Sequence, residues 1–264
     1  MKNGTIVAAL FLLGACGVSD EAGTQLIVGV VHHFAKQADG TYPEHAADEP
    51  RVFTTAENVQ ITLTRGFIVL QSIEIVGCET ASLGRTIWRN IYRGLTLLPE
   101  AHAHSLSSGT RLGEPFVEHI LGEDLLMNEV GDLEPPQGRY CQIRIVVGPA
   151  DDDAANLPAD TDMVGHSLIL EGTYAMDGAD PQPFVLTSDK EQTLTLDLAE
   201  PQEFSKDHLD ATVVIGMHYN TWLDGVDFSA TPEAQSSDAF ANAVGSLHVH
   251  MGPYQAGDEA GHSH

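Results

Sequence analysis

Short runs of β-branched and aliphatic residues recur along the chain, with turn residues between them. The clearest runs cover residues 24–33, 59–76, 140–147, 167–174, 184–186, 193–198, 211–218 and 246–250. Glycine, proline and aspartate separate them, as at Asp177-Gly178. Several short strands with such turns between them are typical of an antiparallel sandwich. The sequence therefore predicts an all-β fold, an antiparallel immunoglobulin-like β-sandwich.

The longest run, residues 59–76, contains a break in its alternation. Its apolar positions change phase around Gly66 and Ser72. Because side chains of a strand alternate between its two faces, a change of phase indicates a bend or a β-bulge. Residues 115–127 and residues 221–228 are the two helical candidates. We therefore expect one or two short helices beside the sheets.

A large excess of acidic side chains limits which kinds of molecule this protein can bind. The chain has 38 Asp and Glu residues against 12 Lys and Arg residues, for a formal net charge of -26. Such a charge repels phosphate backbones and anionic lipid headgroups. It disfavours nucleic acid as a partner and makes cations the natural small ligands.

The first residues resemble a bacterial export signal. A lysine is followed by the apolar residues 6–13 and by small residues, an order typical of signal peptides. Leu13-Gly14-Ala15-Cys16 is similar to the lipobox of bacterial lipoproteins, which implies cleavage before Cys16 and acylation of its sulfur. An ordinary secretory signal with an incidental Cys16 is the alternative. Because Gly17 stands where inner-membrane lipoproteins usually have Asp, the resemblance implies a lipid anchor in the outer membrane.

These features predict four parts of the chain. They are a lipoprotein signal peptide (1–15), a lipidated linker (16–23), a single β-sandwich domain (24–252) and a disordered tail that contains histidines (253–264). The length of 264 residues fits one β-rich domain.

Export to an oxidising compartment changes the interpretation of the two remaining cysteines. Cys78 and Cys141 are predicted to form a disulfide. The alternative is a pair of thiolate metal ligands, but neither cysteine has a close Cys or His neighbour at metal-binding spacing.

Histidine is the residue type most suggestive of chemistry here, with 13 in the chain. Two pairs, His102-Ala103-His104 and His248-Val249-His250, have one residue between the imidazoles. On an extended strand such side chains point to the same face, so both can meet one ion. With a third ligand they would bind copper, zinc or nickel, and the nearby thioethers of Met217 and Met251 favour copper.

We predict His102 and His104 as metal ligands, with His218 or His166 as the third. A polar strand face without metal is the alternative for each pair. His248 and His250, together with the terminal His262-Ser263-His264, could instead form a soft scavenging tail. A further pair, His32-His33, cannot point both rings to one side of a strand.

Motifs of the common enzyme classes are absent from the sequence. It contains no G-x-S-x-G, H-E-x-x-H, P-loop or G-x-G-x-x-G motif. We therefore expect no enzyme activity, and a hydrolase built on a serine near His102 is a minor alternative.

Residues 163–228 are similar to the MbnP-like family of exported copper-binding proteins, related to the MopE and CorA surface proteins of methanotrophs. The similarity lies in MVGHSLILEGTY, PQPFVL, TLTLDL and ATVVIGMHYNTWLDGVDF, and in the earlier LTRGFIVLQSIEIV. It implies a copper-binding β-sandwich that is not an enzyme.

In the MopE and CorA branch, histidines and a tryptophan oxidised to kynurenine hold Cu(I), within a Trp-x-His arrangement. The resemblance implies that His102-Ala103-His104 takes this place, with histidine in place of tryptophan and His166 or His218 as the third ligand. It also implies a di-haem peroxidase-like partner, for which Trp88 or Trp222 would be the substrate.

The sequence thus predicts a bacterial exported lipoprotein that binds copper, or else zinc, for storage, acquisition or delivery. Its location would be the outer membrane, facing the periplasm or the cell surface. The alternative is a structural or adhesion-type surface lipoprotein in which the histidines have no metal role.

Overall fold

The computed structural model describes residues 23–35, 43–78, 107–176 and 178–252. Within these residues the regular secondary structure is mostly strand, as predicted. The strands are β1 (Gln25–His33), β2 (Arg51–Thr54), β3 (Gln60–Gly77), β4 (Arg111–Leu112), β5 (Phe116–His119), β6 (Asn128–Leu133), β7 (Gly138–Val147), β8 (Leu168–Ala175), β9 (Gln182–Ser188), β10 (Gln192–Phe204), β11 (Asp210–His218) and β12 (His248–Met251). The helices are η1 (Tyr219–Thr221) and α2 (Pro232–Gly245), and no described helix is long and apolar enough to cross a membrane.

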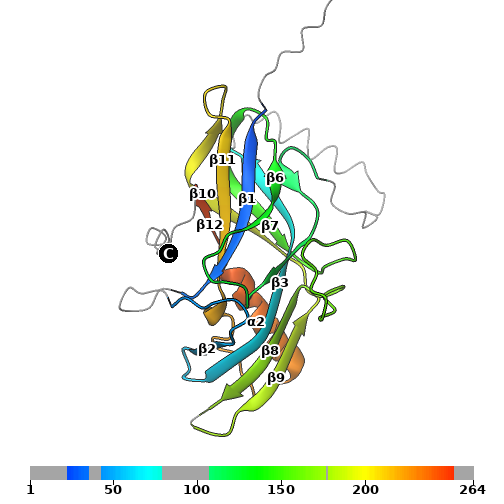
Figure 1. The fold of residues 1–264 in the computed structure, drawn as a ribbon, viewed down its shortest axis with the longest axis vertical. Coiled ribbons are helices and arrows are strands. Elements are labelled where there is room, and N and C mark those ends of the chain that lie inside the picture. Colours follow the sequence, from blue (N-terminus) through cyan, green and yellow to red (C-terminus); the bar gives the residue numbers. More distant parts are fainter. Residues whose placement is uncertain (1–22, 36–42, 79–106, 177, 253–264) are drawn as a thin grey trace, which may run out of the picture.

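Two sheets form the molecule (Figure 1). The smaller sheet has the strand order β12-β11-β1-β6, and the larger has β10-β7-β3-β8-β9, with β2, β4 and β5 also paired to β3. Adjacent strands are antiparallel except for β1 and β11, which run parallel with Gln25 opposite Asp210 and His33 opposite His218. The all-β sandwich expected from the sequence is therefore present, with one parallel pair that the sequence did not predict.

The long strand β3 organises the larger sheet. Its first part pairs with β2 and β8, and its second part pairs with β7 and β4. The register shifts between Leu63 and Arg65 and again between Leu70 and Ser72. These two irregularities lie beside Gly66 and Ser72, so the predicted breaks in the regular strand are confirmed.

The main hydrophobic core lies between the sheets. It contains alternate residues of β1 and β11, such as Leu26, Val28 and Val30 from β1 and Val213 and Ile215 from β11. Residues of β3, β7 and β8 face them from the larger sheet. This alternation fixes which side chains of β1 and β11 point inward and which point outward.

The α-helix lies in a segment where the signals for a helix in the sequence are weak. Residues 115–127, expected to be helical, contain the strand β5 and a turn. The helix is α2, beside β9 (Figure 1). Thr231 caps its N-terminus by accepting a hydrogen bond from the backbone N–H of Ala234, and Pro232 begins its first turn. The second candidate, residues 221–228, forms turns after η1.

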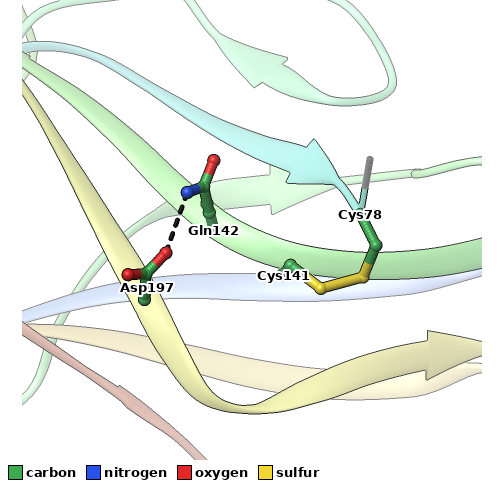
Figure 2. Close-up of a disulfide and its surroundings, with 4 residues drawn as sticks. All are labelled: Cys78, Cys141, Gln142 and Asp197. Carbon is green, nitrogen blue, oxygen red and sulfur yellow. Dashed lines mark hydrogen bonds between the residues drawn. A yellow bond between two sulfur atoms is a disulfide. The ribbon is translucent and has the colours of Figure 1, made fainter. Parts of the chain in front are cut away.

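A disulfide joins Cys78 to Cys141, as predicted. Figure 2 shows that it links the chain just after β3 to the neighbouring strand β7. On β7 the next residue, Gln142, donates a side-chain hydrogen bond of 2.8 Å to Asp197 of β10. The crosslink therefore fixes one end of the larger sheet.

Candidate metal centre

Three imidazoles from three neighbouring strands converge on the outer face of the smaller sheet. They belong to His33 at the end of β1, His218 at the end of β11 and His248 at the start of β12. Each offers one ring nitrogen, and the three nitrogens all lie within 4.8 Å of one another. No other group of three or more His, Cys, Asp or Glu residues in the described part of the chain meets that spacing.

Strand pairing explains why these residues meet. The parallel register places His33 directly opposite His218, and the antiparallel register places His248 opposite Gly216, two residues earlier on β11. Val30 and Ile215 point into the main core, so His33 and His218, each three residues further along, point to the outer face.

The three rings pack against one another. His218 and His248 are stacked, with centroids 4.7 Å apart and planes 24° apart. The His33 ring meets both of them edge-on, at 4.7 Å and 84° to His218 and at 5.6 Å and 75° to His248. His33 is fully buried, whereas His218 and His248 are half-buried.

Backbone carbonyl groups determine which nitrogens are available to an ion. The Nδ1 of His33 lies 2.8 Å from the carbonyl oxygen of Phe34, and the Nδ1 of His248 lies 3.2 Å from that of Ser246. A carbonyl oxygen only accepts, so each Nδ1 carries the proton and donates it. The Nε2 of both rings is then the nitrogen that would face an ion, and a backbone partner on the other ring nitrogen is a common way of orienting histidine ligands.

Three neutral imidazoles form a donor set suited to zinc, copper or nickel. Metal–nitrogen bonds of about 2.0 Å place two ligands of a tetrahedral ion about 3.3 Å apart. Since the three nitrogens lie within 4.8 Å, small ring rotations would bring them to that spacing.

A buried ionic cluster lies behind this centre, on the inner face of β1. The Nδ1 of His32 is 2.5 Å from the Glu118 carboxylate of β5, and both side chains are fully buried. Glu118 also accepts hydrogen bonds of 3.0 and 3.2 Å from the Asn128 amide. The contact between His32 and Glu118 therefore connects the smaller sheet to the larger one.

Asp124 is the second carboxylate of the cluster. It accepts hydrogen bonds from Tyr219 at 2.8 Å and from the His45 ring at 2.9 Å, and the Arg51 guanidinium lies 3.6 Å away. Burial and the Asp124 charge raise the pKa of Tyr219 well above its ordinary value, so this phenol stays protonated. The cluster therefore anchors the residues next to two of the three histidines, because His32 directly precedes His33 and Tyr219 directly follows His218.

The predicted site residues have different outcomes. His218 lies in the three-histidine group. His166 precedes β8 of the other sheet and is not a member of that group. His102, His104, Cys16, Trp88, the signal peptide and the tail all lie outside the described residues.

Two further predictions concerned methionine and tryptophan. Met217 is fully buried in the main core, on the face of β11 opposite His218, so its thioether does not support a soft copper site. Trp222 is also buried in that core, where its Nε1 donates a hydrogen bond of 2.8 Å to Ser246.

Sequence reasoning missed His33 as a candidate ligand and treated His248 only as part of a pair with His250. The available signal was that His33 and His218 each end an apolar run, in VVHH and VVIGMH. Only the parallel pairing of two strands far apart in the sequence brings these ends together.

Comparison of the chain with protein-family models, with curated proteins and with solved structures finds no match.

Proposed function

We propose that this protein is an exported bacterial lipoprotein that binds a transition metal through His33, His218 and His248. Copper is the metal that we propose for this site. The observation that carries the proposal is the convergence of three imidazole nitrogens within 4.8 Å. At a site with nitrogen ligands, divalent copper binds more tightly than the other first-row metals, including zinc. The resemblance of residues 163–228 to exported copper-binding proteins favours the same metal.

The location rests on separate observations. The lipobox-like residues before Cys16 imply export and acylation, and the Cys78–Cys141 disulfide suits an oxidising compartment. The net charge of -26 attracts cations toward the surface. Storage, acquisition or delivery of copper outside the cytoplasm fits these properties.

Metal analysis tests the ligand set. Full-length untagged protein is purified from copper-supplemented cells, as the wild type and as a variant with His262→Ala and His264→Ala to remove the terminal histidines. We expect about one copper per chain in both. Alanine at His33, His218 or His248 should remove most of it, whereas His208→Ala, at an exposed turn, should not. Equal copper in the His33/His218/His248 triple variant would contradict the proposal.

The lipid anchor has its own test. We expect radiolabelled palmitate to be incorporated into the wild type and not into Cys16→Ala. The wild type should fractionate with the outer membrane and the variant with soluble proteins. If the wild type remains soluble and unlabelled, the lipid anchor is refuted and an ordinary secretory signal is the remaining interpretation.

A further inference from the structure

The geometry points to Gly216 as the residue that positions His248 in the metal centre, because the missing side chain on β11 leaves the space in which the imidazole lies. This inference rests on the proposed metal-binding function and names a residue that controls the number of ligands.

The order of strands places the backbone of His248 far from that of His33. Its strand, β12, and the strand of His33, β1, lie on opposite sides of β11. Neighbouring strands are about 4.8 Å apart, so the two backbones are separated by about twice that distance. An imidazole from β12 can approach His33 only by lying across the outer face of β11.

Gly216 is the residue over which the ring lies. It pairs with His248 on one side and with Val31 of β1 on the other. An ideal Cβ at Gly216 would be 2.0 Å from the Nε2 of His248, 2.4 Å from Cε1 and 2.8 Å from Cδ2. The atom nearest to that Cβ is the nitrogen that would bind the metal, so no larger residue is compatible with the observed ring position.

Backbone conformation does not account for this glycine. Gly216 is not among the described glycines with positive φ, and it lies inside a regular strand where glycine weakens the sheet. Close approach by another group is the usual reason for such a residue. Here the approaching group is the His248 imidazole.

A methyl group at position 216 should therefore convert a three-imidazole centre into a two-imidazole centre. The His248 ring would have to rotate away from β11, while His33 and His218 remain opposite each other. Gly216→Ala and His248→Ala should consequently remove the same ligand, and their effects on metal affinity should not add.

The experiment measures Cu²⁺ affinity by competition with a chelator for the full-length wild type, Gly216→Ala, His248→Ala and the double variant. We expect each single variant to bind at least about tenfold more weakly, and the double variant to bind no more weakly than His248→Ala. Electron paramagnetic resonance should detect one coupled nitrogen fewer in Gly216→Ala. Gly77→Ala is the matched control, because a Cβ at that strand position would have no atom closer than 3.8 Å. Wild-type affinity and nitrogen count in Gly216→Ala, or additive losses, would overturn the inference.

Thermal unfolding without metal separates this inference from the proposed function. Gly216→Ala should lower the midpoint when His248 is present, and much less in the His248→Ala background, because the clash needs the ring. If Gly216→Ala fails to fold, recovery of folding in the double variant supports the inference, and failure of both variants overturns it. A wild type that binds no copper would refute the proposed function, while the unfolding data would still report on the packing of His248 over Gly216.

Discussion

His32 and His33 are consecutive in β1 and point to opposite faces of the smaller sheet. The His32 ring contacts the buried carboxylate of Glu118 on the larger sheet, whereas the His33 ring meets His218 and His248 on the outer face. Of these two adjacent imidazoles, that of His32 connects the two sheets and that of His33 belongs to the candidate metal centre.

The buried cluster should contribute strongly to stability. Asp124→Ala would leave Arg51 and His45 without their buried carboxylate partner. Breaking a buried ion pair in this way costs about 3–5 kcal/mol, and denaturant unfolding should report a loss of that order. The control is Asp160→Ala, which removes an exposed partner of Arg65 and should change stability by less than about 1 kcal/mol. Equal effects of the two variants would refute a structural role for the cluster.

The disulfide should stabilise the larger sheet. Cys78 and Cys141 are 63 residues apart in sequence, and closing a loop of that length in the unfolded chain stabilises a protein by about 4 kcal/mol on the chain-entropy estimate. The Cys78→Ser/Cys141→Ser variant should lose about that much free energy of unfolding. A reducing agent should have the same effect on the wild type and none on the variant; unchanged wild-type stability under full reduction contradicts the prediction.

His119 should make stability depend on pH. Burial lowers the pKa of this imidazole below the ordinary value of 6.5, although the Asp48 charge opposes the shift. At pH values below about 6.5 the imidazole binds a proton in the unfolded chain, whereas in the folded chain it stays neutral until a lower pH. The free energy of unfolding therefore decreases as the pH falls.

Replacement by an aromatic residue isolates this contribution. His119→Phe can keep the stacking on Phe67, whose ring centroid is 4.7 Å away. We expect the stability of this variant relative to the wild type to increase between pH 7 and pH 5. His208→Phe, at an exposed turn, is the control, and a pH-independent difference for His119→Phe would argue against the shift.

The motif His102-Ala103-His104 remains a prediction from the sequence alone. If these residues supply ligands, His102→Ala/His104→Ala in the full-length protein should lose copper affinity as His218→Ala does. The comparison uses the same chelator competition as for Gly216. Unchanged affinity in the double variant would remove this motif from the ligand set and leave the three described histidines as the proposed site.

The strands were predictable because the composition of each one is a local property of the sequence. Residues 25–33 and 210–218 are each rich in β-branched and aliphatic residues, and no distant partner is needed to recognise such a run as a strand. The helix α2 was harder to find because most of its residues are small or polar. The sequence Thr231-Pro232-Glu233 nevertheless has an N-terminal cap, a proline at the first position and an acidic first turn.

The wrong helix prediction has a physical reason. In β5, Phe116 packs in the main core while Val117 packs in a second cluster with Phe67 and Val69. A strand buried on both faces shows adjacent apolar residues rather than alternation. Together with Ile120 and Leu121 this pattern resembles one face of a helix.

The candidate metal centre could be predicted only in part, because it depends on strand pairing. His218 stood out at the end of an apolar run, but His33 becomes its neighbour through parallel pairing across 185 residues of sequence. Local patterns carry no information about which strand will lie beside which.

The parallel alignment of β1 with β11 has one more consequence. A slip of one residue along β11 would turn Leu26, Val28 and Val30 out of the core and expose them to water. The position of His33 beside His218 is therefore set by aliphatic side chains further along the same two strands, none of which belongs to the candidate metal centre. The same core packing would keep these two strand ends side by side even if other residues replaced the histidines.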